Sequence, residues 1–72
     1  MDYIYMALEW DPFLDELEVK CAYTKKYNLE NWLRKELQDK TTLSHLTCYR
    51  IRGAHVTEID PYDVIKEDQG EL

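Results

Sequence analysis

The stretch from Tyr27 to Lys40, YNLENWLRKELQDK, constrains the fold most, because it alone shows a helical period. Its apolar residues follow the i, i+3, i+4, i+8 spacing of one buried stripe: Leu29, Trp32, Leu33 and Leu37. Asn28 is a suitable N-cap, which places Tyr27 and Trp32 at the two positions of a hydrophobic staple. A helix with a single apolar stripe needs one partner surface. We therefore expect it to lie across one face of a sheet.

Alternation of apolar and polar residues predicts strands on both sides of this helix. The expected strands are Tyr3–Trp10, Glu16–Thr24, Leu46–Arg52 and His55–Ile59. Pro12 breaks the chain between the first two strands, and Gly53 marks a turn between the last two. The predicted fold class is α+β, with the order β-β-α-β-β. It consists of an antiparallel β-sheet of three to four strands with one α-helix packed on one face.

The chain of 72 residues is expected to form one domain over residues 1–67. Pro61 suits the first position of a short C-terminal helix or turn that ends at about Glu67. Residues 68–72 are expected to fray. A chain near this size has a marginal core, and association with a second copy is one common remedy.

The first predicted strand has two different faces. Ile4, Met6, Leu8 and Trp10 form the set that we expect to face the helix. Tyr3, Tyr5, Ala7 and Glu9 form the other set, which is unusually aromatic for a solvated face. Either another element covers this face, or it forms a homodimer interface at Tyr3, Tyr5 and Ala7. We favour the interface, because tyrosine is enriched in such contacts and the chain is too short to cover both faces of its sheet. In the second strand, the apolar, core-facing set is Leu17, Val19, Cys21 and Tyr23.

The formal net charge is −6, and it is unevenly distributed. Residues 1–18 carry −6, residues 19–57 carry +5 and residues 58–72 carry −5. If the two acidic ends meet, their carboxylates form a ridge that binds a basic protein and releases counterions as DNA does. The predicted partner-binding residues are Asp11, Asp15, Glu16, Glu18, Glu58, Asp60 and Asp63. A merely solubilising acidic surface is the alternative.

The sequence does not predict an enzyme or a cofactor, because it lacks hydrolase, zinc-protease and P-loop motifs. Four residues are candidate zinc ligands, but their spacing is a weak signal and we expect no metal: Cys21, His45, Cys48 and His55. A disulfide between Cys21 and Cys48 is geometrically possible on neighbouring strands. The N-terminus does not resemble a signal peptide, and no apolar run is long enough for a membrane span. We therefore expect a cytoplasmic protein with reduced thiols.

Eight basic residues, with Tyr49 nearby, form a candidate face for direct nucleic-acid binding: Lys20, Lys25, Lys26, Arg34, Lys35, Lys40, Arg50 and Arg52. The acidic ends of the chain would repel phosphate, so we expect no direct nucleic-acid binding.

The small size, the acidic balance, the aromatic first strand and the runs YTKKYNLENWLRKEL and CYRIRGAHVTEIDPY resemble the small early proteins of tailed bacteriophages. The resemblance is one of general pattern over about residues 3–62. It implies a host-directed inhibitor in the host cytoplasm, and some members of this group are DNA mimics that occupy the basic surfaces of nucleoid proteins such as HU. The alternative function is a protein-interaction module that places an aromatic sheet face, centred on Tyr3 and Tyr5, on a hydrophobic partner.

Overall fold

A computed structural model describes residues 2–69 and confirms the predicted α+β class and element order. The elements are β1 (Ile4–Asp11), β2 (Glu16–Tyr23), α1 (Lys26–Lys40), β3 (Leu46–Arg52), β4 (His55–Ile59) and α2 (Pro61–Gln69). The four strands form one sheet in the order β2-β1-β3-β4, and every neighbouring pair is antiparallel. The short C-terminal helix extends through residues 68 and 69, where we expected fraying, and residues 70–72 lie outside the described part of the chain.

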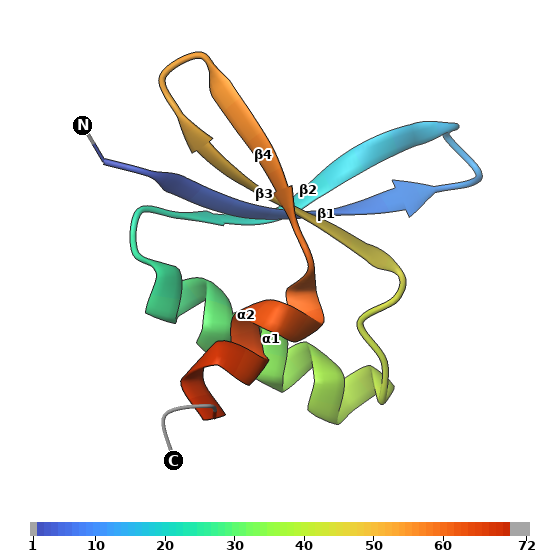
Figure 1. The fold of residues 1–72 in the computed structure, drawn as a ribbon. Coiled ribbons are helices and arrows are strands. Elements are labelled where there is room, and N and C mark those ends of the chain that lie inside the picture. The colour runs from blue at the N-terminus through green and yellow to red at the C-terminus, as the bar shows by residue number, and fades with distance from the viewer. Residues whose placement is uncertain (1, 70–72) are drawn as a thin grey trace.

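Both helices lie on the same side of the sheet (Figure 1). The buried core sits between them and the sheet, and it consists of Ala7, Leu29, Leu33, Leu43, Leu46, Cys48, Val64 and Ile65. The helix stripe predicted from the sequence is confirmed, because Leu29 and Leu33 are fully buried and Trp32 and Leu37 pack against the same core. The two hairpins, β1–β2 and β3–β4, diverge from the centre of the sheet (Figure 1).

The predicted start of the long helix is wrong. Helix α1 begins at Lys26, so that Lys25 is the N-cap and has an extended backbone with no side-chain cap. Asn28 lies inside the first turn, and its N–H donates to the carbonyl of Lys25 at 3.1 Å. Only two residues separate the end of β2 from α1, so the chain turns into the helix before Asn28 is reached. The hydrophobic staple between Tyr27 and Trp32 was predicted from an N-cap at Asn28, so it does not apply to a helix whose N-cap is Lys25.

The predicted faces of β1 are also reversed. Ala7 lies in β1 between Cys21 of β2 and Cys48 of β3, on the helix side, and it is 0% exposed. Tyr5 packs against the core from the same side, whereas Ile4 is 43% exposed. A small residue beneath the helices lets the leucines of α1 approach the sheet closely. Ala7 has no surface to offer a second copy, so the predicted dimer contact through Tyr3, Tyr5 and Ala7 does not fit this arrangement.

A β-bulge in β2 explains why its alternation is misleading. Ala7 pairs with Cys21, but the next residue, Leu8, pairs with Val19, so Lys20 has no partner in the ladder. An extra residue in one strand shifts the register by one and moves the following side chains to the other face. Cys21 and Tyr23 consequently pack against the core, whereas Leu17 and Val19 share the helix-free face with β1 residues. The prediction of one continuous core-facing set in β2 is therefore wrong.

Candidate functional site

The end of the β1–β2 hairpin projects beyond the helices (Figure 1), and we call residues 9–20 the hairpin arm. Every residue from 12 to 20 is exposed. The turn is ordered by Asp11, whose Oδ1 accepts hydrogen bonds from the backbone N–H groups of Phe13 at 2.9 Å and Leu14 at 3.3 Å. Asp15 closes the turn with a φ of 54°, in the left-handed region that aspartate tolerates better than most residues. The arm is thus a defined structure without packing of its own against the core.

One face of the arm is a ladder of carboxylates. Glu9 lies directly opposite Glu18, and Asp11 lies directly opposite Glu16. Like charges at directly opposed positions destabilise a sheet. Within the arm, Lys20 lies 3.6 Å from a Glu18 oxygen in the one ion pair described for these side chains. Five carboxylates and one lysine give the arm a formal charge of −4. The negative charge of the arm is therefore largely not neutralised by basic side chains within the arm.

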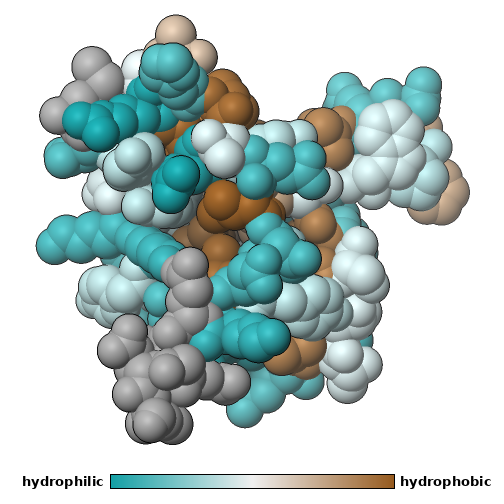
Figure 2. All heavy atoms as spheres, in the orientation of Figure 1, coloured by the Kyte–Doolittle hydropathy of each residue, from teal (hydrophilic) through white to brown (hydrophobic). Residues whose placement is uncertain are grey.

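The other face and the tip of the arm are apolar. Trp10 lies opposite Leu17 and Leu8 lies opposite Val19, on the face that the helices do not cover. Phe13 at the tip is 96% exposed, so it makes almost no contact with its own chain. Leu14, Trp10, Leu17 and Val19 are between 47% and 64% exposed. Figure 2 shows hydrophobic side chains among hydrophilic ones on the projecting arm. Neighbouring apolar side chains that stay exposed in this way are typical of interaction surfaces.

The structure divides the seven predicted partner-binding residues into two groups. Asp11, Asp15, Glu16 and Glu18 lie together on the arm, at the β2 edge of the sheet. Glu58 lies in β4, which is the opposite edge, and Asp60 and Asp63 follow that strand. Three strand spacings separate the two edge strands, or about 14 Å. The ridge that would join the two acidic ends is therefore not formed.

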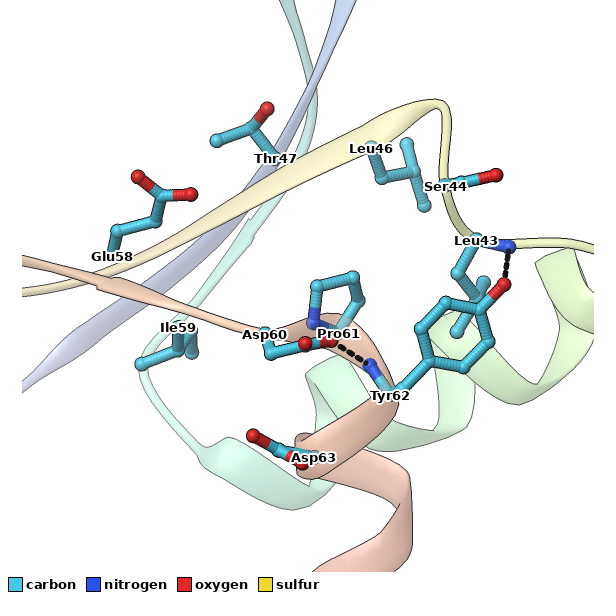
Figure 3. Close-up of a pocket in the computed structure, with 10 residues that line it drawn as sticks. All are labelled: Leu43, Ser44, Leu46, Thr47, Glu58, Ile59, Asp60, Pro61, Tyr62 and Asp63. Carbon is cyan, nitrogen blue, oxygen red and sulfur yellow. Dashed lines mark hydrogen bonds between the residues drawn. The ribbon is translucent and has the colours of Figure 1, made fainter.

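The second acidic group lines an open cavity of about 590 Å³ between β4, α2 and the start of β3 (Figure 3). Two of its members have local structural roles. Asp60 caps α2, because its Oδ1 accepts a hydrogen bond from the N–H of Tyr62 at 2.8 Å. Asp63 lies in the first turn of α2, where a negative charge is favourable at the positive end of the helix dipole. These two structural roles explain why Asp60 and Asp63 lie where they do, and no partner protein is needed to explain their positions.

Tyr62, in the same cavity, ties α2 to the segment between α1 and β3. The N–H of Leu43 donates to its hydroxyl oxygen at 2.9 Å (Figure 3). The Thr42 hydroxyl lies 3.1 Å from the same oxygen. The hydrogen bond from Leu43 lowers the pKa of Tyr62, with a further contribution from Thr42, because both bonds stabilise the phenolate. This contact holds the buried Leu43 in place at the end of the core.

The substitution Tyr62→Phe removes the acceptor for the Leu43 N–H. We expect it to lower the urea midpoint of unfolding, because the N–H of the buried Leu43 loses its hydrogen-bond acceptor. Tyr27→Phe is the matched control, because Tyr27 is 60% exposed and its change should have little effect. Urea unfolding followed by circular dichroism measures both. Equal losses in the two variants would mean that the Tyr62 hydroxyl does not support the fold.

The candidate zinc ligands are spread over the molecule. Among the residues whose side chains are described, no group of three or more His, Cys, Asp or Glu residues is placed to hold a metal ion. Cys21 and Cys48 are free thiols on β2 and β3, which are separated by β1, so the expectation that they occupy neighbouring strands is wrong. Burial raises the pKa of the Cys48 thiol to about 12, and a nearby Cys21 contributes in the same direction. Cys48 is therefore a protonated core residue.

No protein-family model matches the sequence, and comparison with curated proteins and with solved structures returned no match. Neither helix in the described residues is long and apolar enough to cross a membrane. The evidence for the candidate site is therefore its geometry.

Sequence reasoning identified four carboxylates of the arm but missed Glu9 and the apolar side chains. The run Pro12-Phe13-Leu14 within a turn was the available signal, since large apolar residues are unusual at a loop tip.

Proposed function

We propose that this protein is a non-enzymatic, cytoplasmic binding protein that inhibits a basic partner protein by docking its hairpin arm onto it. The observation that carries the proposal is the two-sided arm, with facing carboxylate pairs on one side and an exposed apolar ladder on the other. A partner groove with an apolar wall and a rim of lysine or arginine would match both faces. It would relieve the like-charge repulsion and remove the apolar side chains from water.

In its more specific form, the proposal is that the arm occupies a nucleic-acid-binding surface, as in the host-takeover proteins of bacteriophages that the sequence resembles. Nucleoid proteins such as HU have surfaces of this kind. The exposed carboxylates of the arm would then replace phosphates, and a DNA duplex would compete with the arm for the same site. The second acidic group at the β4 edge is not required for this contact.

Calorimetric titration of purified HU with the protein, at about 50 to about 200 mM salt, tests the proposal. We expect affinity to fall steeply with salt, and Glu16→Lys/Glu18→Lys to weaken binding by about tenfold or more. Asp39→Lys/Glu58→Lys is the matched control, because it makes the same change in charge at two exposed carboxylates on α1 and β4, away from the arm. No binding at the lowest salt would exclude HU as the target. Equal losses in both charge variants would exclude the arm as the contact.

The apolar side of the arm has its own test. Phe13→Ser should weaken binding about tenfold or more at every salt concentration, since burying a phenylalanine contributes about 1.5–3 kcal/mol. Val56→Ser is the control, because Val56 is 61% exposed on β4 at the other edge of the sheet.

A second candidate function is an interaction module that uses the whole helix-free sheet face on a hydrophobic partner. The observation that favours it is that Ile4 and Val56 are exposed there, as well as the arm residues. In that case Val56→Ser would weaken binding as much as Phe13→Ser, and the affinity would be nearly independent of salt.

A further inference from the structure

Two arginine side chains converge on Tyr3, at the end of β1 opposite to the arm. The Cζ atoms of Arg50 and Arg52 lie 4.9 Å and 5.3 Å from the centroid of the Tyr3 ring. Arg50 and Arg52 occupy alternate positions of β3, so both point to the same side of the sheet, roughly 6.6 Å apart along the strand at a rise of ~3.3 Å per residue. Tyr5 pairs with Arg50 and its ring lies 5.9 Å from that of Tyr3. Both guanidinium groups thus lie against one aromatic ring, that of Tyr3.

Neither arginine makes an ion pair with a carboxylate among the residues whose side chains are described. The Nε of Arg50 is also buried and has no hydrogen-bond partner there. Placing two positive charges close together costs free energy, and a buried donor without an acceptor adds to that cost. In a chain with a net charge of −6, two arginines that make no ion pair with a described carboxylate call for an explanation.

Tyr3, Arg50, Arg52, His55 and Thr57 line an open cavity of about 520 Å³. We call it the arginine pocket. The volume lies within the range of about 300–1,000 Å³ that is usual for small-molecule sites. None of the described carboxylates lines it. Arg50 also lines a second cavity of about 260 Å³, which Glu58, Asp60 and Asp63 line from its other side, although no ion pair joins Arg50 to a described carboxylate. The Gly53 turn, with a φ of 59°, brings His55 opposite Arg52 and closes one end of the arginine pocket.

We propose that the arginine pocket binds a phosphate group, carried by a phosphate monoester or present as the free ion, and that this activity is separate from the docking of the arm. Two guanidinium groups carry two positive charges, which match the charge of about −1.5 to −2 on a phosphate monoester better than the single charge of a carboxylate. The planar donor fork of arginine suits oxyanions of this geometry. The Thr57 hydroxyl and the His55 ring offer further donors from β4. An anion here would neutralise both guanidinium groups at once.

NMR titration of the full chain, following the Nε–Hε signals of Arg50 and Arg52, tests this proposal. The probes are inorganic phosphate and O-phosphoserine, with sodium chloride at equal ionic strength as the reference. We expect saturable shifts with phosphate compounds and none with chloride. Tighter binding of O-phosphoserine identifies a phosphorylated molecule as the ligand, and equal or tighter binding of inorganic phosphate identifies the free ion. Both results support the pocket, because a chain with a net charge of −6 repels anions unless a specific site holds them.

Arg52→Gln should weaken phosphate binding by about tenfold or more, as expected for losing a charge-assisted hydrogen bond. Arg52 is exposed, so the variant is expected to remain folded. Lys35→Gln is the matched control, because it removes the same charge from an exposed site on α1. Absence of saturable shifts in the wild-type chain would overturn the proposal. So would an equal loss of affinity in Arg52→Gln and Lys35→Gln, since that result would show attraction by overall charge alone.

Discussion

Ala7→Asp is expected to unfold most of the protein at room temperature. Ala7 is 0% exposed and lies between Cys21 and Cys48 in the centre of the sheet, beneath the helices. No cation among the described residues belongs to the core that surrounds it. A buried carboxylate without a partner costs several kcal/mol, and the larger side chain also has no room. A domain of 72 residues has a total stability of roughly 4–11 kcal/mol at about 0.05–0.15 kcal/mol per residue.

Ile4→Asp is the control for this prediction, because Ile4 belongs to the same strand and is 43% exposed on the helix-free face. We expect it to lower the free energy of unfolding by about 1 kcal/mol, the span of strand preferences at exposed positions. Far-ultraviolet circular dichroism and urea titration compare the two variants. A folded Ala7→Asp variant beside an unfolded Ile4→Asp variant would show that the helices cover the other face of β1, as alternation alone suggested.

The reversed faces of β1 illustrate what alternation can and cannot predict. The sequence correctly separated Ile4 and Trp10 from Tyr5 and Ala7, because residues two apart in a strand share a face. Which set the helices cover depends on how closely α1 approaches the sheet, and the fully buried Ala7 is the position that permits close approach. Hydrophobicity favoured the larger residues for the core. Packing of the leucines of α1 against the strand favoured the smallest one.

The bulge at Lys20 had no signal in the sequence either. Leu17, Val19, Cys21 and Tyr23 alternate without interruption along the chain. The register shift opposite Ala7 and Leu8 divides this set between the two faces. It also creates the apolar ladder of the arm, since it brings Val19 and Leu17 opposite Leu8 and Trp10. The residues of the arm were thus visible in the sequence, but their two-sided arrangement was not.

The order of the strands in the sheet explains why the predicted acidic ridge does not form. Charge counts showed correctly that both ends of the chain are acidic. The sheet order β2-β1-β3-β4 places these ends at opposite edges, and sequence spacing carries no information about that order. The same order sets Tyr3 beside Arg50 and Arg52, whose separation in sequence hides the arginine pocket. Because β1 leads from Tyr3 to the arm, the two proposed sites lie at opposite ends of one strand and can be altered independently.

Leu33→Ala is expected to lower the free energy of unfolding by about 2–5 kcal/mol. Leu33 is 0% exposed and belongs to the buried stripe of α1, so truncation removes apolar contact and leaves a cavity between helix and sheet. Alanine is a better helix former than leucine, so the loss reports on packing and not on helix propensity. This cost is a large fraction of the stability that a chain of this size can have.

Leu14→Ala is the matched control, because it makes the same chemical change at the tip of the arm, where Leu14 is 64% exposed. We expect a change within about 0.5 kcal/mol, as is usual for surface positions. Urea midpoints of the two variants provide the comparison, and a similar loss in both would contradict the view that the arm makes no contribution to the core. If Leu14 can be shortened at no cost, its exposed apolar side chain does not serve the fold. Loss of binding in arm variants of unchanged stability would then report on the contact with the partner alone.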